Sequence, residues 1–572
     1  MEDASTRSIF ARSWMRLLTV LAVCGCNFFA HLGTLAVGLM EARNFVAARE
    51  MAAGGSWLIP TMNGQLRLAK PPLPTWAVAA VLQLTGGTTD PALLRLPAAL
   101  MATLLVLFFW GLAKELTRAA PSETLAPGRT AWLAALVLAS SLLVVTVGRE
   151  GHWDIFSNSL AVGSLWLLAR GWNQAGPAYA SFLGAGLLLG GTILSKGPVS
   201  LYTIVLPFVA TYAWVGQPDG RARLRRHWRG VLTAVGVAAV VGGAWPMYVW
   251  QHVPAAAAAV ARTEATAWGE RHVESVWYYF NFPVFAGVWT VVALAVLAVP
   301  YARRRAGRFV PYALALGWLL ASFVLLSIVP EKKERYMLPL LPPLVLLLTG
   351  LLRYWEQEFE ARRAAATGPD YWLVRGWATV LLLAGVAVPA LVGVARLPGF
   401  GITSARFILT VLIFAALAGF VAWRGWQQRQ ATALIMASIL SMSALLLLLL
   451  PAYAALKNRR ATVGLRRLAD IRATPSWQHL PWLALDELHV EQVWVAGRPV
   501  PTWASPADSM PTRPVLVFAA APLAQRLPAA WRGRMRVAAP DSFYLGSRPE
   551  DGQFFTALLL PISTSDNLSV QH

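Results

Sequence analysis

Acidic residues in this sequence stand at the ends of long apolar runs, where a charge is costly and by default indicates a functional site. Glu41 follows the first apolar run in "MEARNFVAAREM", and Asp154 begins a later run in "GREGHWDIF". A carboxylate in such a place can take the proton of an attacking hydroxyl group or orient that group. We therefore predict that Glu41 and Asp154 are catalytic carboxylates.

Basic residues occupy the same kind of position and would act on a different part of the reaction. A fixed cation lowers the barrier of a group transfer when negative charge develops on the leaving group in the transition state. Arginine can bind a phosphate with two parallel hydrogen bonds, whereas lysine acts as a point charge. The residues predicted to bind the phosphate of a leaving group come from "AKPPL", "LSKGP" and "PEKKERYM": Lys70, Lys196, Lys332, Lys333, Arg335 and Tyr336.

The segment "TEATAWGERHVESVWYYF", residues 263–280, is the third concentration of polar groups. Histidine and carboxylates are acceptable ligands for Zn²⁺ or Mn²⁺, but the spacing here fits no established metal motif. No metal ligand is assigned, the cofactor is left unknown, and a divalent cation remains open. A substrate-facing helix is the favoured interpretation, while an aromatic belt at the membrane surface explains the tryptophans and tyrosines equally well. The predicted substrate-binding residues are Arg43, Trp76, Glu264, Arg271, His272 and Glu274.

The composition says which architecture must position these residues. Hydrophobic residues make up 57% of the 572 residues and charged residues only 13%, against roughly 25% charged residues in soluble domains. Stretches long enough to cross a bilayer recur from 17–38 to 431–453, which predicts about thirteen transmembrane helices. The two cysteines, Cys24 and Cys26, lie inside the first stretch and indicate no metal site or disulfide. The chain is therefore expected to be a mainly α, polytopic membrane protein.

The net charge of +21 does not indicate a nucleic-acid-binding protein. The basic residues lie in short clusters between apolar runs, as the positive-inside rule requires of cytoplasmic loops. The densest clusters are "RARLRRHWRG", "YARRRAGR" and "WRGWQQRQ". All three fall on one side when the N-terminus is cytoplasmic, so the candidate site residues lie on the outer face.

Two regions are expected within the chain. Residues 1–453 form the membrane domain, with outer loops at 39–90 and 251–283. The first loop is expected to hold an amphipathic helix lying in the membrane interface over residues 41–53. Residues 454–572 form a small outer α/β domain, with strands expected in "EQVWVA", "RPVLVFAAAP" and "RMRVAA".

The order of the motifs resembles that of the GT-C membrane glycosyltransferases, in particular the bacterial lipid A aminoarabinose transferases and protein mannosyltransferase-like enzymes. The resemblance covers residues from about 20 to 350. It rests on the acid-x-Arg pattern after the first span, then "REM", G-x-W-x-x-P, "NG", "KPPL"-x-x-W, "RLP", "LSKG" and "RYMLP". A subset of GT-C-like bacterial proteins is similar to this chain in carrying "MEARN", "SKGPVSLY" and PEKK-x-RY together.

This resemblance implies an inverting glycosyltransferase that uses a polyprenyl-phosphate-linked sugar and acts on the periplasmic side of the bacterial inner membrane. The implied acceptor is lipid A or another lipid-linked glycan, and the C-terminal domain would face the periplasm. Family members usually carry an Asp-Glu pair after the first span, where this chain has Met40 and Glu41. The aminoarabinose transferases have glutamate before the lysine of "KPPL", where this chain has Ala69. The carboxylate role then passes to Glu41, and Asp154 matches the second acidic position of the family.

Other functions remain as alternatives. Transfer to Ser or Thr of a protein, as by a protein O-mannosyltransferase, is the nearest one. A lipid or solute transporter would also place charges in spans, but such proteins typically show internal repeats, and no matching halves occur here. Membrane lipids, a lipid-linked sugar donor and a lipid or protein acceptor are the expected partners, and nucleic acid is not.

Overall fold

The computed structural model of the chain describes most of the sequence and divides it into two compact units. The described residues are 13–216, 220–270, 272–361, 368–395, 397–461, 463–503, 510–527, 531–544 and 553–562. The first unit comprises the residues up to Leu32, Leu68–Pro74 and Arg95–Ala452, and the second comprises Gly33–Arg67, Thr75–Leu94 and the residues from Tyr453 onward. The second unit thus draws on the first outer loop as well as on the C-terminal segment.

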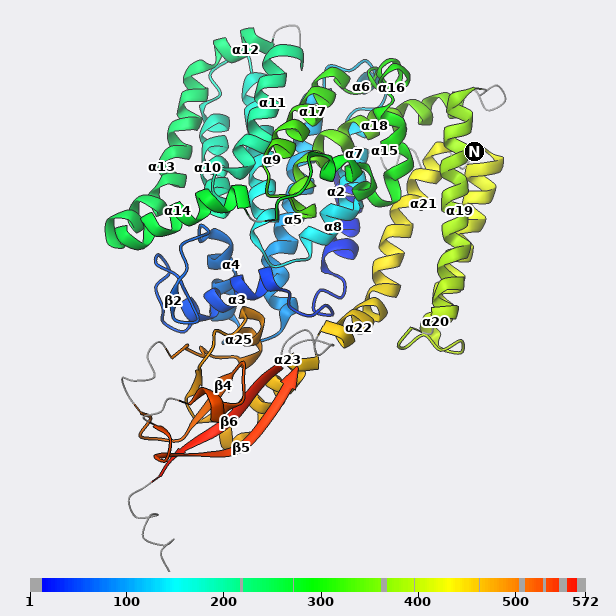
Figure 1. Ribbon diagram of the computed structural model, residues 1–572. Helices are drawn as coiled ribbons and strands as arrows, with labels where there is room; N and C mark the ends of the chain where they lie inside the picture. The colour runs from blue at the N-terminus through cyan, green and yellow to red at the C-terminus, as the bar shows by residue number, and fades with distance from the viewer. Residues whose placement is uncertain are drawn as a thin grey trace, which may run out of the picture. The chain divides into compact units, whose positions relative to one another are not determined.

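The first unit is made of helices (Figure 1). Its α-helices are α2 (Ser13–Cys24), α5 (Pro91–Thr117), α6 (Ser122–Leu125), α7 (Arg129–Ala139), α8 (Leu142–Gly148), α9 (Trp153–Trp172), α10 (Tyr179–Lys196), α11 (Leu206–Thr211), α12 (Gly220–Arg226), α13 (Trp228–His252), α14 (Pro254–Glu270), α15 (Thr290–Leu297), α16 (Val299–Ala306), α17 (Tyr312–Ile328), α18 (Leu341–Ala361), α19 (Pro369–Ala395), α20 (Ala405–Phe420) and α21 (Ala431–Ala444). Helix α22 (Leu450–Ala461) begins in the first unit, and its residues from Tyr453 onward belong to the second. Short π- or 3₁₀-helical pieces complete the first unit: η1 (Gly25–Phe29), η2 (Leu201–Val205), η3 (Tyr212–Gly216), η4 (Val276–Trp289), η5 (Glu334–Leu340), η6 (Val421–Gln427) and η7 (Leu445–Leu449).

The prediction of a mainly helical membrane protein is confirmed. Within the described residues, 7 helices are long and apolar enough to cross a membrane, or 8 when the bent pair Arg129–Ala139 and Leu142–Gly148 counts as one span. Shorter apolar helices lie at Ser13–Phe29, Leu73–Leu84, Leu201–Val215 and Tyr312–Ile328. All of the predicted stretches overlap helical segments, but length and composition alone do not establish thirteen crossings.

Helices α9 and α13 flank α10 and fix the position of its C-terminal end, where Lys196 lies. Helix α10 packs against both α9 and α13. Its contact with α13 is close because α10 presents glycine there: a Cβ atom on Gly186 would lie 2.6 Å from the backbone oxygen of Ala234. Small residues allow helix backbones in a membrane to approach each other and gain van der Waals contact.

The second unit combines helices with a four-stranded sheet. Its helices are α3 (Leu39–Ala52), α4 (Leu73–Leu84), α23 (Val463–Ala473), α24 (Pro475–Gln478), α25 (Val490–Ala496) and α26 (Leu523–Arg526). Its strands are β1 (Thr61–Met62), β2 (Gln65–Leu66), β3 (Trp482–Ala484), β4 (Val515–Ala519), β5 (Met535–Tyr544) and β6 (Gln553–Pro561). The large sheet has the order β3-β4-β6-β5, with β3 and β4 parallel and the other neighbours antiparallel. Strands β4 and β5 confirm the predictions for "RPVLVFAAAP" and "RMRVAA".

The third predicted strand, "EQVWVA", is wrong, because these residues lie in helix α25. The signals at the ends of the helix outweigh the β propensity of its valines. At the start, the side chain of Gln492 accepts a hydrogen bond from the backbone N–H of His489 at 2.8 Å, which satisfies a donor that the helix leaves free. At the end, Gly497 adopts φ 72°, the left-handed conformation that commonly terminates a helix.

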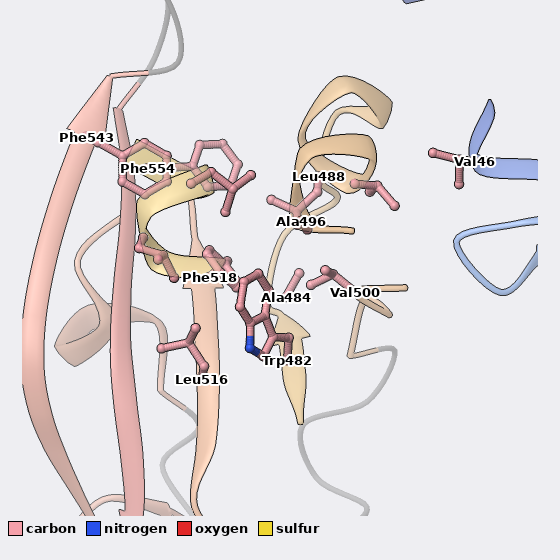
Figure 2. Close-up of a cluster of buried hydrophobic side chains, with 13 residues drawn as sticks. Val46, Trp482, Ala484, Leu488, Ala496, Val500, Leu516, Phe518, Phe543 and Phe554 are labelled. Atoms are coloured by element: carbon pink, nitrogen blue, oxygen red, sulfur yellow. The ribbon is translucent and has the colours of Figure 1, made fainter. Parts of the chain in front are cut away.

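Helix α3 also differs from the prediction, since it is not an amphipathic helix with one face left free. Residues on several of its sides are buried, among them Phe45, Val46 and Met51. Val46 belongs to the core cluster that includes Trp482 and Phe518 (Figure 2). Because both the loop and the C-terminal segment contribute side chains to this core, the outer loop and the C-terminal segment form a single packed unit.

The close contact of α10 and α13 predicts an asymmetric effect of adding one methyl group. Gly186→Ala should lower the free energy of unfolding by about 1–3 kcal/mol, the usual cost of overpacking. Gly236→Ala in α13 is the control, because no atom lies within 4 Å of its Cβ position; this variant should be neutral or stabilised by up to about 1 kcal/mol. Thermal unfolding of both purified variants in detergent measures the difference. Equal midpoints would contradict the packing described here.

Candidate active site

Asp154 lies in the first turn of α9, where the sequence places a carboxylate at the positive end of the helix. His152 is the N-cap residue, and its Nδ1 accepts a hydrogen bond from the backbone N–H of Asp154 at 3.4 Å. A negative charge in the first turn is favoured by the helix dipole. The side chain is almost completely buried, with 3% of Asp154 exposed, so it needs partners for its charge.

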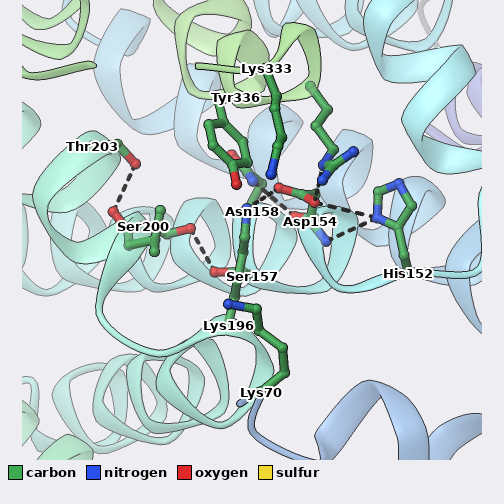
Figure 3. Close-up of polar contacts among 12 residues, drawn as sticks. Lys70, His152, Asp154, Ser157, Asn158, Lys196, Ser200, Thr203, Lys333 and Tyr336 are labelled. Carbon is green, nitrogen blue, oxygen red and sulfur yellow. Dashed lines mark hydrogen bonds and ion pairs between the residues drawn. The ribbon is translucent and has the colours of Figure 1, made fainter. Parts of the chain in front are cut away.

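Two cations supply those partners, and the imidazole of His152 lies beside them. The ammonium group of Lys196, the last residue of α10, forms an ion pair with Oδ1 of Asp154. The Nε of Arg335, in η5, lies 3.3 Å from Oδ2, and Nδ1 of His152 lies 3.4 Å from the same oxygen. Three segments distant in the sequence therefore meet at one carboxylate (Figure 3).

A second ion pair lies in the segment that precedes η5. The ammonium of Lys333 is 2.5 Å from Oε1 of Glu331, and the hydroxyl of Tyr336 lies 3.5 Å from the same oxygen. The ammonium of Lys196 lies 4.2 Å from the centre of the Tyr336 ring, within the range of an attractive cation–π contact. Tyr336 thus contacts both the ammonium group that pairs with Asp154 and the carboxylate that pairs with Lys333, and Figure 3 shows its ring beside Lys333.

The segment around His272 is hydrogen-bonded to the segment around Lys332. Val273 and Glu331 form an antiparallel bridge. The backbone N–H of Lys332 donates to the carbonyl of His272 at 3.1 Å, and the N–H of Glu274 donates to the carbonyl of Pro330 at 3.3 Å. His272 itself has a left-handed backbone with φ 49°. Residues 272–274 are therefore fixed to the strand-like segment that leads into Lys333 and Arg335.

Lys70 and Glu264 form a separate ion pair with an Nζ–Oε2 distance of 3.1 Å. Both side chains are about 30% exposed, at 30% and 28%. A pair of this exposure contributes little stability, on the order of 1 kcal/mol or less. Since Lys70 was predicted to bind phosphate and Glu264 to bind substrate, the structure brings a predicted cation and a predicted acid together.

Two titrating groups lie in loops beside the Asp154 cluster. Burial alone would raise the pKa of Glu150, but its hydrogen bond with His152, an Nε2–Oε2 distance of 2.7 Å, and the nearby Arg335 bring the pKa below its usual value. Burial lowers the pKa of the Lys332 ammonium, which donates a hydrogen bond to the carbonyl of Val329 at 2.8 Å. Lys332 therefore has a backbone partner, whereas Lys333 and Arg335 are paired with carboxylates.

The remaining predicted residues have other surroundings. Glu41, Arg43 and Trp76 belong to the second unit. Glu41 is 4% exposed and accepts a hydrogen bond from the backbone N–H of Gly38 at 3.2 Å. Trp76 donates to the carbonyl of Trp57 at 2.6 Å, and Arg43 lies 3.8 Å from the sulfur of Met40. Arg271 lies outside the described residues.

The divalent cation left open by the sequence has no evident ligand set in the described part of the chain. No group of three or more His, Cys, Asp or Glu side chains there is arranged to hold a metal ion. The carboxylate of Glu264 instead contacts Lys70.

The site contains two residues that the sequence analysis did not select. His152 stands between Glu150 and Asp154, and Asn158 donates a hydrogen bond from Nδ2 to the backbone carbonyl of Asp154 at 2.8 Å. The signal for Asn158 was its position four residues after Asp154, which places both on one face of α9. The signal for His152 was its position just before the helix, where a polar side chain caps free N–H groups.

Two families match separate parts of the chain. Residues 69–250 match the family described as dolichyl-phosphate-mannose-protein mannosyltransferase. Residues 263–402 match the Alg9-like mannosyltransferase family. Together these matches cover the segments that supply Lys70, Asp154, Lys196 and Arg335.

Relatives over longer stretches are undecaprenyl phosphate-alpha-4-amino-4-deoxy-L-arabinose arabinosyl transferases. The protein of Edwardsiella ictaluri is 27% identical over 55% of this chain and 55% of its own length. That of Shewanella sediminis is 27% identical over 59% and 60%, and that of Sodalis glossinidius is 25% identical over 72% and 71%. The chain thus spans less than two thirds of the first two relatives.

The solved structures extend the likeness to nearly the whole fold. ArnT from Cupriavidus metallidurans bound to undecaprenyl phosphate has a TM-score of 0.67 and 18% identity, covering 96% of this chain and 98% of that one. The chain shares the fold of this ArnT. The apo state of the same ArnT gives a TM-score of 0.65, with 97% and 98% of the two chains covered. The GT-C resemblance predicted from the motifs is confirmed, and this GT-C fold carries the cluster around Asp154.

The buried pair in this GT-C fold makes a prediction about stability that does not depend on activity. Asp154→Asn leaves Lys196 and Arg335 without a counter-charge, and Lys196→Met removes one of the two cations. Breaking a buried pair from one side typically costs about 3–5 kcal/mol, much of which returns when both partners are replaced. We expect the double variant to be less destabilised than the sum of the single variants, as measured by thermal unfolding.

Lys70→Met is the matched control for this cycle, because its pair with Glu264 is partly exposed. It should cost no more than about 1 kcal/mol. Strictly additive effects of the Asp154 and Lys196 variants would mean that the two side chains do not interact energetically.

Proposed function

We propose that this chain is an inverting glycosyltransferase that transfers a sugar from a polyprenyl-phosphate donor to a lipid A type acceptor, or to another lipid-linked glycan. The observation that carries the proposal is the buried Asp154, which fixes Lys196 and Arg335 in one place. Fixed cations of this kind suit a reaction whose leaving group is a phosphate. The relatives support the same donor class, since their names specify an undecaprenyl-phosphate-linked aminoarabinose.

The cations would act on the leaving group. As the bond between the sugar and the phosphate oxygen breaks, its electron pair passes to the phosphate, and Lys196, Arg335 and Lys333 are placed to stabilise that charge. Such groups lower the barrier because they are oriented before the reaction begins. Lys70 and Lys332 would contribute further positive charge, and the Tyr336 ring keeps the ammonium of Lys196 in position.

The two proposed carboxylates, Asp154 and Glu41, would have different roles. Both oxygens of Asp154 already contact cations or His152, so Asp154 is best suited to position Lys196 and Arg335. Glu41 is then the proton acceptor for the attacking hydroxyl, with its proton taken as the new bond to the sugar forms. A single displacement of this kind inverts the anomeric centre. Arg43, Trp76, Glu264, Arg271, His272 and Glu274 are proposed to contact sugar or acceptor.

The membrane arrangement belongs to the same proposal. We infer about thirteen crossings, with the shorter and bent helices completing those that qualify by length. The basic clusters would be cytoplasmic, and the Asp154 cluster and the sheet-containing unit would face the periplasm. Lipids of the inner membrane surround the bundle, and nucleic acid is no partner.

Transfer of label measures this function directly. Purified full-length protein in nanodiscs would receive undecaprenyl-phosphate-linked sugars, aminoarabinose among them, with lipid A and with a Ser/Thr-containing protein extract as separate acceptors. Glu41→Gln should lower transfer at least about 100-fold, on the scale of losing a general base. Glu115→Gln is the control: this carboxylate contacts Arg118 and Asn173, far in the sequence from every proposed site residue, and should leave transfer unchanged.

The outcomes separate the alternatives. Label on protein rather than on lipid A would favour the protein mannosyltransferase-like function that the match over residues 69–250 suggests. Normal transfer by folded Glu41→Gln would move the proton acceptor to another group. Absence of transfer with every donor, combined with lipid movement across the bilayer, would favour the transporter.

A further inference from the structure

A cavity of about 430 Å³ lies at the turn between α16 and α17, and neither the candidate active site nor the proposed reaction uses it. Its lining includes Arg303, Arg304 and Arg308 together with the residues that begin α17, Tyr312 to Leu314. The turn belongs to "YARRRAGR", one of the basic clusters of the sequence. This volume is in the range of small-molecule and headgroup sites, roughly 300–1,000 Å³.

The positive charges of the cavity arginines are only partly neutralised by the described side chains. In the part of the chain that the structure describes, no ion pair or hydrogen bond engages the guanidinium group of Arg303 or Arg304, and both residues are exposed. Arg308 lies 3.8 Å from Glu358, with 67% of its side chain exposed. Three guanidinium groups therefore line one cavity, and among the described side chains only the carboxylate of Glu358, beside Arg308, lies within ion-pairing distance of them.

Arg305, in the same cluster, differs from Arg303 and Arg304 because a carboxylate neutralises its guanidinium group. Arg305 forms an ion pair with Asp370, with Nε 3.0 Å from Oδ1 and Nη2 3.0 Å from Oδ2. Arg305 does not line the cavity. An aspartate thus pairs with one arginine of the cluster, whereas no carboxylate among the described side chains pairs with Arg303 or Arg304.

The first turn of α17 adds to the preference for an anion. The N–H of Ala315 donates to the carbonyl of Pro311 at 3.0 Å, so the N–H groups of Tyr312 to Leu314 precede the hydrogen-bonded ladder of the helix. Such groups, with the positive end of the helix dipole, favour phosphate when side-chain cations are also present.

An exposed apolar stripe begins at the same cavity. Ala313, which lines the cavity, is followed on one face of α17 by Leu320, Val324 and Ile328, exposed by 51%, 53% and 68%. The spacings of seven, four and four residues keep them on one side of the helix. At 1.5 Å per residue, the 17 residues of α17 extend about 26 Å, close to the hydrocarbon thickness of a bilayer. The stripe therefore suits an acyl chain that continues from a headgroup in the cavity.

We propose that the cavity lined by Arg303, Arg304 and Arg308 binds the phosphate headgroup of an anionic membrane phospholipid, whose acyl chains lie along the exposed face of α17. This site is distinct from the proposed donor-phosphate site. Glu331, Lys333 and Arg335 follow the C-terminal end of α17, whereas the cavity lies at its N-terminal end, a full helix length away. The bound lipid would hold the α16–α17 turn against the membrane surface.

The test compares two lipids with identical acyl chains, phosphatidylglycerol and phosphatidylcholine, bound to the purified full-length protein and counted by native mass spectrometry. Wild type should retain phosphatidylglycerol more tightly than phosphatidylcholine. Each guanidinium that hydrogen-bonds the phosphate directly contributes about a fivefold gain in affinity, which an arginine outside the cavity does not share, so Arg303→Gln/Arg304→Gln should weaken phosphatidylglycerol about 30-fold. Both side chains are exposed, and unchanged thermal unfolding would confirm that the variant is folded.

The control is Arg221→Gln/Arg225→Gln, a second pair of exposed arginines on α12, outside this cavity. It should change binding less than threefold. Equal losses in both double variants would reduce the effect to overall charge and overturn the proposal. So would equal retention of the two lipids by wild type, whatever the behaviour of the variants. Binding of glycerol 3-phosphate as tight as that of phosphatidylglycerol would identify a site for a free phosphate ester instead of a lipid.

Discussion

The requirement to pair a carboxylate that is buried among apolar helices governs the arrangement of the first unit. An unpaired ion in such a place is so costly that the fold must bring cations to it. Asp154 therefore imposes a meeting of α9 with the end of α10 and with η5, because Lys196 and Arg335 come from those elements. The apolar surfaces of the helices favour many packings, and this pairing selects among them. The cluster that results also brings two fixed cations to one place, as a reaction of phosphate requires.

The second unit is constrained instead by the small size of its hydrophobic core. Its sheet has few strands and could not by itself bury a large core, so residues from the segment after the first apolar run complete it: Val46 from α3 belongs to the same core cluster as Trp482 and Phe518. This segment gains a fixed structure in return. Glu41 lies in that structured helix rather than in a free loop, with its carboxylate on the first turn and a backbone N–H as a partner. A general base needs such a fixed position, and packing of this kind can supply it.

Hydropathy made the helices and the class of protein predictable, and charge at the ends of apolar runs made Asp154 and Lys196 predictable. Their contact was not, because it depends on how α9, α10 and η5 pack. His152 escaped notice since a histidine in a short polar loop has no distinctive spacing. The number of crossings was uncertain because α7 and α8 divide one apolar run at a bend of 61°. Helix α25 was predicted to be a strand because valine favours strands. In the structure, the capping hydrogen bond of Gln492 and the left-handed Gly497 favour the helix instead.

The short bridge between Val273 and Glu331 has a mechanical consequence. Hydrogen bonds on either side of it join the chain that leaves α14 to the chain that enters η5. A shift of α14 would therefore displace the backbone that carries Lys333 and Arg335. A displacement of that backbone would likewise move the chain that follows α14. Movement of α14 and the positions of the two cations would then be coupled through the backbone, without a separate element to link them.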